Sequence, residues 1–154
     1  MCIVIDTCTF DTVFNPDAKT HLNFEPVLKW ILKGNGKLVF GGTVYSEEIK
    51  QSPNRIGLVV ELRKKRKVID IEDTTIDELS GKISKKITDS DFDDPHIIAL
   101  ISISKSKLVC SIDKRAYPYF KNRNLYPNRR VPIIYSSIKH SKHLSDKNIP
   151  KDYI

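Results

Sequence analysis

The opening stretch Cys2-Ile3-Val4-Ile5-Asp6-Thr7 determines how the rest of the sequence is interpreted. Its first four residues are apolar without interruption and include β-branched side chains, a pattern typical of a strand that is buried on both faces. Such strands occur in parallel sheets that carry helices on both sides. Asp6 follows the run directly, so we expect a carboxylate at the carboxyl end of the first strand.

Strands and helices are predicted to alternate along the rest of the chain. Further strands are expected at 37–40, 68–71, 108–112 and 131–135, and helices at 24–33, 43–50, 56–67, 75–87 and 95–104. The helices show the 3.6-residue apolar period, and Asp94-Pro95 is a favourable beginning for the last of them. This alternation predicts an α/β fold, a three-layer α/β/α sandwich with a central, mainly parallel sheet.

Length and composition indicate one globular domain. The chain has 154 residues, 40% hydrophobic and 29% charged, and no apolar run approaches the roughly 18 residues of a membrane span. We expect the domain to occupy residues 1–136 and a basic tail without clear periodicity to occupy 137–154. The start shows neither a basic leader nor a long apolar stretch, which predicts a cytoplasmic protein without a membrane partner.

Positive charge is concentrated in two parts of the sequence. The net charge is +7, and from Lys114 onward there are ten Lys or Arg residues and only two acids. A second basic run occupies 63–67. Two such regions favour a polyanionic partner, because Lys and Arg release counterions from phosphate groups. The three cysteines are odd in number and lack Cys-x-x-Cys spacing, so we expect neither a disulfide framework nor a thiolate metal site.

Four acids that are far apart in the sequence fall at or near element boundaries. Asp6 and Asp113 follow predicted strands, Asp94 begins a predicted helix, and Glu48 lies in the helix after the second strand. Ligands bind at the carboxyl ends of parallel strands, so these acids could converge on one edge. Each also has a structural explanation as a cap, a turn residue or an exposed side chain. A pocket of carboxylates repels itself, so their combination predicts a site for a hard divalent cation, Mg²⁺ or Mn²⁺.

Neighbouring acids and other enzyme classes are alternatives to this interpretation. Glu47, Asp91 and Asp93 are close rivals of the chosen acids. A phosphoacceptor receiver domain would show a pair of acids after the first strand. A haloacid-dehalogenase phosphatase would need a second Asp two residues after the first, where this chain has Cys8. The sequence therefore favours neither of these two classes.

Taken in order, these features resemble the PIN-domain nucleases from residue 3 to about residue 135. The strand ending at Asp6 and the Glu48-Ile49 pair are similar to the first two family motifs, and Asp94-Pro95-His96-Ile97-Ile98-Ala99-Leu100 resembles the third closely. The fourth motif, an apolar strand followed by Ser or Thr, any residue and Asp, is similar to Ser111-Ile112-Asp113. Many family members have a further acid two residues later. Arg115 stands there in this chain, which leaves four acids.

The resemblance implies a metal-dependent endoribonuclease that hydrolyses RNA phosphodiester bonds by metal-activated water and leaves 5′-phosphate and 3′-hydroxyl ends. It implies that Asp6, Asp94 and Asp113 hold Mg²⁺ or Mn²⁺, with Glu48 binding a second metal or orienting the nucleophile. Hydroxyl groups near the acids should orient the carboxylates, and two candidates are Thr7 and Ser111.

Basic and aromatic side chains are expected to bind the RNA, whether single-stranded or structured. The candidates for the backbone are Lys114, Arg115, Arg129 and Arg130, while Tyr117, Tyr119 and Phe120 could stack on bases or pack against the core. Single-domain members of the family include toxins of toxin–antitoxin pairs, which implies a small antitoxin protein and a homodimer as partners. A stand-alone RNA-processing or defence nuclease and a catalytically silent RNA-binding module of PIN fold are the alternatives.

Overall fold

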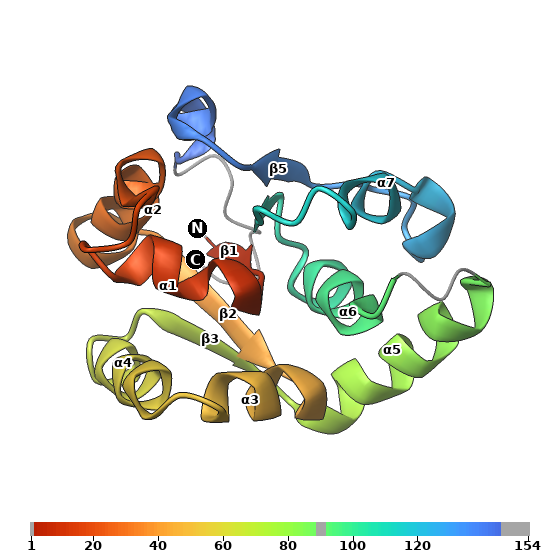
Figure 1. The fold of residues 1–154 in the computed structure, drawn as a ribbon. Helices are drawn as coiled ribbons and strands as arrows, with labels where there is room; N and C mark the ends of the chain where they lie inside the picture. Colours follow the sequence, from red (N-terminus) through yellow and green to blue (C-terminus); the bar gives the residue numbers. More distant parts are fainter. Residues whose placement is uncertain (1, 89–91, 146–154) are drawn as a thin grey trace.

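The computed structural model describes residues 2–88 and 92–145, and its centre is a five-stranded sheet (Figure 1). The strands are β1 (Cys2–Ile5), β2 (Lys37–Gly41), β3 (Val68–Ile71), β4 (Leu108–Cys110) and β5 (Ile133–Tyr135). All four pairings between them are parallel, and the order β3-β2-β1-β4-β5 places β1 in the middle. The sheet is thus entirely parallel, where the sequence predicted a mainly parallel one.

Helices cover both faces of this sheet. On one side lie α1 (Phe10–Phe14), α2 (His21–Lys33) and α4 (Pro53–Lys64), and on the other α5 (Asp73–Lys86), α6 (Pro95–Ser104) and α7 (Tyr117–Phe120) (Figure 1). The helix α3 (Thr43–Lys50) follows β2 closely, and three short 3-10 helices are η1 (Thr7–Thr9), η2 (Arg123–Leu125) and η3 (Ile138–His143). The predicted three-layer α/β/α sandwich is confirmed.

The core is densest where α6 packs on the sheet. All four residues of β1 are fully buried, and so is the run Ile97–Ile101 of α6, which contacts β1 and β2. A helix that is apolar on every side belongs inside the fold, where each buried Ile or Leu contributes about 1.5–3 kcal/mol to stability. The beginning of α6 is therefore held firmly beside the central strands.

Most element boundaries lie close to their predicted positions. The clearest difference is α4, which spans Pro53–Lys64 instead of 56–67. Proline is tolerated in the first turn of a helix, and Arg66 ends the helix by adopting a left-handed φ of 59°. The elements α1 and α7 were not predicted, because four or five residues are too few to show a helical period.

The C-terminal part of the described chain lies against α2. The Tyr135 hydroxyl donates to the Asn23 carbonyl oxygen at 2.8 Å, and the Ile138 amide donates to Asn23 Oδ1 at 3.4 Å. Residues 146–154 lie outside the described residues, so the domain boundary after residue 136 stays a prediction. Within 2–88 and 92–145, no helix is both long enough and apolar enough to cross a membrane.

Candidate metal centre

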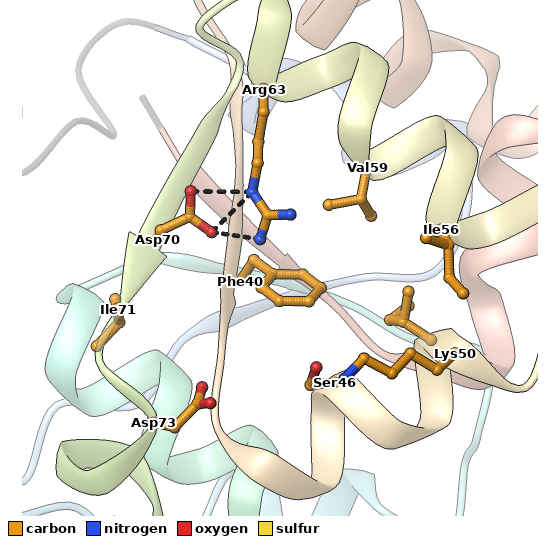
Figure 2. A pocket seen from close by; sticks show the side chains of 10 residues that line it. Phe40, Ser46, Lys50, Ile56, Val59, Arg63, Asp70, Ile71 and Asp73 are labelled. Atoms are coloured by element: carbon orange, nitrogen blue, oxygen red, sulfur yellow. Dashed lines mark hydrogen bonds and ion pairs between the residues drawn. The ribbon is translucent and has the colours of Figure 1, made fainter.

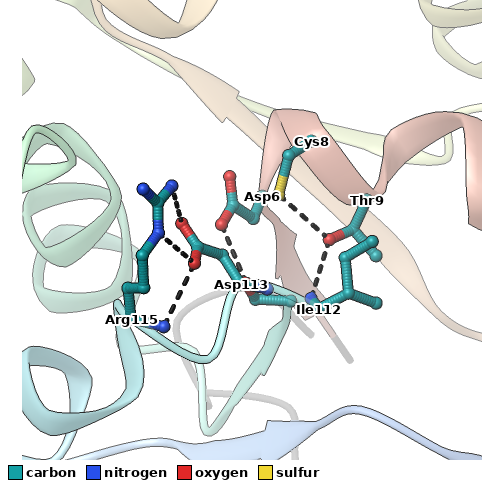
Figure 3. A network of polar contacts seen from close by, with 7 residues as sticks. Asp6, Cys8, Thr9, Ile112, Asp113 and Arg115 are labelled. Atoms are coloured by element: carbon teal, nitrogen blue, oxygen red, sulfur yellow. Dashed lines mark hydrogen bonds and ion pairs between the residues drawn. The ribbon is translucent and has the colours of Figure 1, made fainter.

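The candidate site lies at the carboxyl edge of the sheet, where β1 and β4 end side by side. The Asp6 amide donates to the Cys110 carbonyl oxygen at 2.9 Å, which extends the ladder to the residue that follows β1. As Figure 3 shows, Asp6 and Asp113 consequently lie together; Ser111 Oγ donates to Asp6 Oδ2 at 2.8 Å and accepts from the Asp113 amide at 3.1 Å. Two acids more than a hundred residues apart are thus joined through one hydroxyl.

The loop after β1 is tied to the loop after β4 by a second hydroxyl. Thr9 Oγ1 accepts from the Ile112 amide at 3.0 Å and lies 3.5 Å from the Cys8 sulfur (Figure 3). Burial, and next the charge of Asp6, raises the pKa of the Cys8 thiol to about 12. This cysteine therefore stays protonated at neutral pH, although its side chain borders the acids.

Glu48 reaches the same edge through the placement of α3. Gly42, immediately before the helix, has a φ of 87°, a conformation that favours glycine. The Tyr45 hydroxyl then donates to the Ile5 carbonyl oxygen at 2.8 Å, inside the core. Side chains three residues apart share a helix face, so Glu48 faces the end of β1, where Thr7 Oγ1 donates to Glu48 Oε2 at 2.9 Å.

Asp94 and His96 enter the site from the beginning of α6. Asp94 is the N-cap residue, yet its side chain makes no capping hydrogen bond, so capping does not account for this acid. His96 is only 2% exposed, and its Nε2 lies 3.2 Å from Glu48 Oε2. One possible ligand atom from each of Glu48, Asp94 and His96 lies within 4.8 Å of the other two. The structure therefore gathers two carboxylates and one imidazole.

Burial and mutual repulsion act on the acids of this cluster. Burial is the main cause that raises the pKa of Asp6. Burial, followed by the charge of Asp6, raises the pKa of Asp94 to about 7. Burial also acts on Glu48, but the hydrogen bond and charge of His96 and the hydrogen bond from Thr7 outweigh it, so the pKa of Glu48 is lowered. Negative charge at this edge is only partly compensated by neighbouring side chains.

Asp113 is in a different environment from the other three acids. The Arg115 side chain donates to it from Nε at 3.1 Å and from Nη2 at 3.3 Å, and the Arg115 amide adds a bond at 3.1 Å (Figure 3). These hydrogen bonds lower the pKa of Asp113. Neither Asp113 nor Asp6 is one of the clustered ligand residues, and the Ser111 hydroxyl links Asp6 Oδ2 to the backbone amide of Asp113. Arg115 thus neutralises the acid nearest to it.

The rival acids are placed differently from the chosen ones. Glu47 and Asp93 are exposed, whereas Glu48 and Asp94 are partly buried in the cluster. Asp91 lies outside the described residues. Sequence reasoning assigned no role to His96, although a polar residue in an otherwise apolar helix, directly after Asp94-Pro95, was a visible signal.

The predicted substrate-binding residues fall at opposite edges of the sheet. Lys114 and Arg115 are exposed in the loop after β4, on the side of the acids. Arg129 and Arg130 precede β5, and in a parallel sheet the residue before a strand lies at the amino edge. The structure therefore does not bring Arg129 and Arg130 to the acids. Arg130 lines a separate pocket of about 350 Å³ with residues that precede β4.

One further cation near the acids was not predicted. Arg55 on α4 donates to both oxygens of Asp11, at 3.2 and 3.1 Å. Its charge is among the causes that lower the pKa of Glu48.

The three aromatic residues after the fourth acid serve the fold. Tyr119 stacks on Phe92 with ring centroids 4.2 Å apart, and Phe120 is fully buried. The Tyr117 hydroxyl donates to the Ser111 carbonyl oxygen at 2.6 Å. Tyr117 therefore supports the loop that carries Ser111 and Asp113, and the packing role accounts for all three.

A second pocket, of about 300 Å³, lies between α3, α4 and β3 and contains none of the four predicted acids (Figure 2). Its polar centre is Arg63, whose Nη2 donates to Asp70 Oδ1 at 2.6 Å and whose guanidinium lies 4.7 Å from the centre of the Phe40 ring. Ser46, Lys50 and Asp73 also line this pocket, but Arg63 holds the carboxylate of Asp70, and the Gly42 amide donates to Asp73 Oδ1 at 2.9 Å, so the two acids here are already engaged. The carboxyl edge of the sheet is the better candidate for chemistry.

No family model matches the chain, and neither a curated protein nor a solved structure matches it. The functional assignment therefore depends on the residues of the site and on the resemblance of the motifs.

Proposed function

We propose that this protein is a metal-dependent endoribonuclease of PIN-like type. The observation that carries the proposal is the cluster of Glu48, Asp94 and His96 at the carboxyl edge of the central strands, with Asp6 near enough for its charge to raise the pKa of Asp94. The preference for RNA rests on the resemblance of the four motifs to that family.

The donor set is compatible with a divalent cation. Carboxylate oxygens are the ligands preferred by Mg²⁺ and Mn²⁺, and an imidazole nitrogen is accepted by Mn²⁺. Asp6 and Asp94 have raised pKa values because their charges are buried near one another. A cation beside them would replace this repulsion by attraction, which explains why such a cluster is tolerated in a fold.

The residues divide into ligands and groups that orient them. Asp6, Glu48 and Asp94 would hold the cation, which when bound supplies a more acidic water and polarises a phosphoryl oxygen. Ser111 fixes the carboxylate of Asp6, and Thr7 fixes that of Glu48, through single hydrogen bonds.

Binding of the substrate phosphate would fall to cations at the rim of the site. Arg115 has an 82% exposed side chain and can exchange its Asp113 partner for a phosphate, which accepts the same pair of hydrogen bonds. Lys114 adds an exposed charge beside it. The exchange would leave Asp113 ionised next to the remaining acids, where a second cation could bind it.

The test is cleavage of a labelled single-stranded RNA, with a DNA of the same sequence in parallel. Wild-type protein should cleave RNA with Mg²⁺ or Mn²⁺ and not with EDTA, and Asp6→Asn should lower the rate by at least about 100-fold while staying folded. Asp17→Asn, an exposed acid elsewhere, is the matched control. Cleavage that survives EDTA or Asp6→Asn would overturn the proposal, and binding without cleavage would favour a silent RNA-binding module.

The toxin interpretation is a further part of this proposal and needs a cellular test. Induced expression of the wild type should arrest growth, and Asp6→Asn should not. Unimpaired growth with an active enzyme would instead favour a stand-alone nuclease. An antitoxin would be sought as a small protein that relieves the arrest and blocks cleavage in the purified system.

A further inference from the structure

His96 is an unusual residue at its position in the fold. The five residues that follow it in α6 are all apolar and buried, and the side chain of His96 itself is only 3% exposed. An imidazole in such a place needs polar partners, because burying an unpaired polar group is unfavourable. Its Nε2 lies 3.2 Å from Glu48 Oε2, and one of its ring nitrogens lies within 4.8 Å of a carboxylate oxygen of Asp94.

The spacing of the three side chains suits a shared ion. Two ligands at right angles, each about 2.1–2.2 Å from a cation, are about 3.0–3.1 Å apart, and two opposite ligands are about 4.2–4.4 Å apart. The observed 3.2 Å between His96 Nε2 and Glu48 Oε2 is close to the first value. The possible ligand atoms of Glu48, Asp94 and His96 all lie within 4.8 Å of one another, which leaves room for one cation between them. Small side-chain movements would therefore complete the coordination.

The kind of donor determines which cation is favoured. Mg²⁺ takes oxygen ligands and gives up its water reluctantly, whereas an imidazole nitrogen strengthens binding of first-row transition cations. We propose that His96 supplies a nitrogen ligand to the cation held by Glu48 and Asp94, so that this centre selects a transition dication such as Mn²⁺ over Mg²⁺. This inference rests on the metal centre of the proposed function and names the ion class that it takes.

A purely orienting role for His96 makes a different prediction. If the imidazole ring only donates a hydrogen bond to Glu48, removing the ring should weaken the binding of every cation to the same extent. His96→Gln separates the two roles, because a glutamine amide can still donate to Glu48 but offers no nitrogen lone pair. The four-histidine chain also provides a control, His140→Gln, which removes an imidazole remote from the cluster in sequence.

The experiment measures cation binding directly, with MnCl₂, ZnCl₂ and MgCl₂ titrated into the metal-free protein by calorimetry. Wild type should bind Mn²⁺ at least about tenfold more tightly than Mg²⁺, and His96→Gln should lose most of that ratio with little change for Mg²⁺. Electron spin echo spectra of the Mn²⁺ protein should show modulation from a coordinated nitrogen, which disappears in His96→Gln and persists in His140→Gln.

Three results would overturn the inference: an unmodulated wild-type spectrum, an equal loss of Mn²⁺ and Mg²⁺ affinity in His96→Gln, or the absence of any Mn²⁺ or Zn²⁺ binding. The spectrum of the wild type decides the matter even if the variant does not fold. RNA cleavage by the same samples separates the two proposals. Cleavage without nitrogen coordination refutes only the role of His96, and nitrogen coordination without cleavage refutes only the nuclease.

Discussion

Replacing Asp94 by asparagine should make the cation-free protein more stable at pH 8. The pKa of Asp94 in the fold is about 7, against an ordinary value of 3.8. That difference is worth at most about 4 kcal/mol, and the partial exposure of Asp94 to solvent reduces it to on the order of 2 kcal/mol. The neutral amide avoids this cost, and no capping hydrogen bond is lost.

The sign of the effect sets its pH dependence. Because the folded pKa is raised, the protonated Asp94 contributes stability that is fully present below about pH 3.8 and is lost as the pH rises through about 7. The wild type should therefore lose stability over this range, and Asp94→Asn should lose less. The two proteins should differ by about 4–8 °C in Tm at pH 8 and hardly at all near pH 4.

Added cation should reverse the ranking of the two proteins. At a Mn²⁺ concentration of about 100 times its Kd the wild type gains about 2.7 kcal/mol, and Asp94→Asn should gain far less. Thermal unfolding followed by circular dichroism, with EDTA or with Mn²⁺, measures both effects. Asp93→Asn, one residue earlier and exposed, should stay within about 0.5 kcal/mol of the wild type. A Tm difference that is the same at pH 4 and pH 8 would refute the electrostatic reasoning.

Two further predictions concern the neighbours of the site. Glu48→Gln should remove most of the Mn²⁺-induced rise in Tm and slow RNA cleavage, whereas the exposed Glu47→Gln should change neither; the reverse ranking would show that the wrong glutamate was chosen. Neutralising Lys114 and Arg115 should weaken RNA binding and lower the slope of log affinity against log salt by about 1.4, because two single-strand phosphate contacts are lost. Neutralising Arg129 and Arg130, at the opposite edge of the sheet, should leave the slope unchanged, and the reverse result would place the RNA at the amino edge.

The elements with strong local signals were predictable from the sequence. The predicted bounds of α3, β3 and α6 coincide with those of the structure. Pro53 stops α3 shortly before it, Pro95 begins α6, and Val68-Ile69-Asp70-Ile71 has the β-branched composition of a short strand. Grouping Asp6 with Asp113 needed only the rule that parallel strands share a carboxyl edge. The same rule, applied to the residues before β5, would have placed Arg129 and Arg130 at the opposite edge.

Side-chain partnerships were beyond what sequence reasoning could reach. The pairing of Arg115 with Asp113 depends on a rotamer, and adjacency in sequence does not determine it. His96 and Glu48 lie on different helices and are 48 residues apart in the sequence. Their contact therefore depends on the packing of α6 against α3, which sequence spacing does not show. The tertiary arrangement, and not the spacing, therefore identifies the imidazole of the cluster.

The pairing of β1 with β4 also determines when during synthesis the carboxylate of Asp6 can be fixed. Asp6 and Ser111 are 105 residues apart in the sequence, and β1 is the central strand of the sheet. Most of the chain must therefore be synthesised before β4 can pair with β1. Such distant pairings close late, because the entropy of a long loop has to be overcome first. A nascent chain that has emerged as far as α6 already contains Glu48, Asp94 and His96, whereas the Asp6 carboxylate gains its hydrogen bond from Ser111 only after β4 has been made.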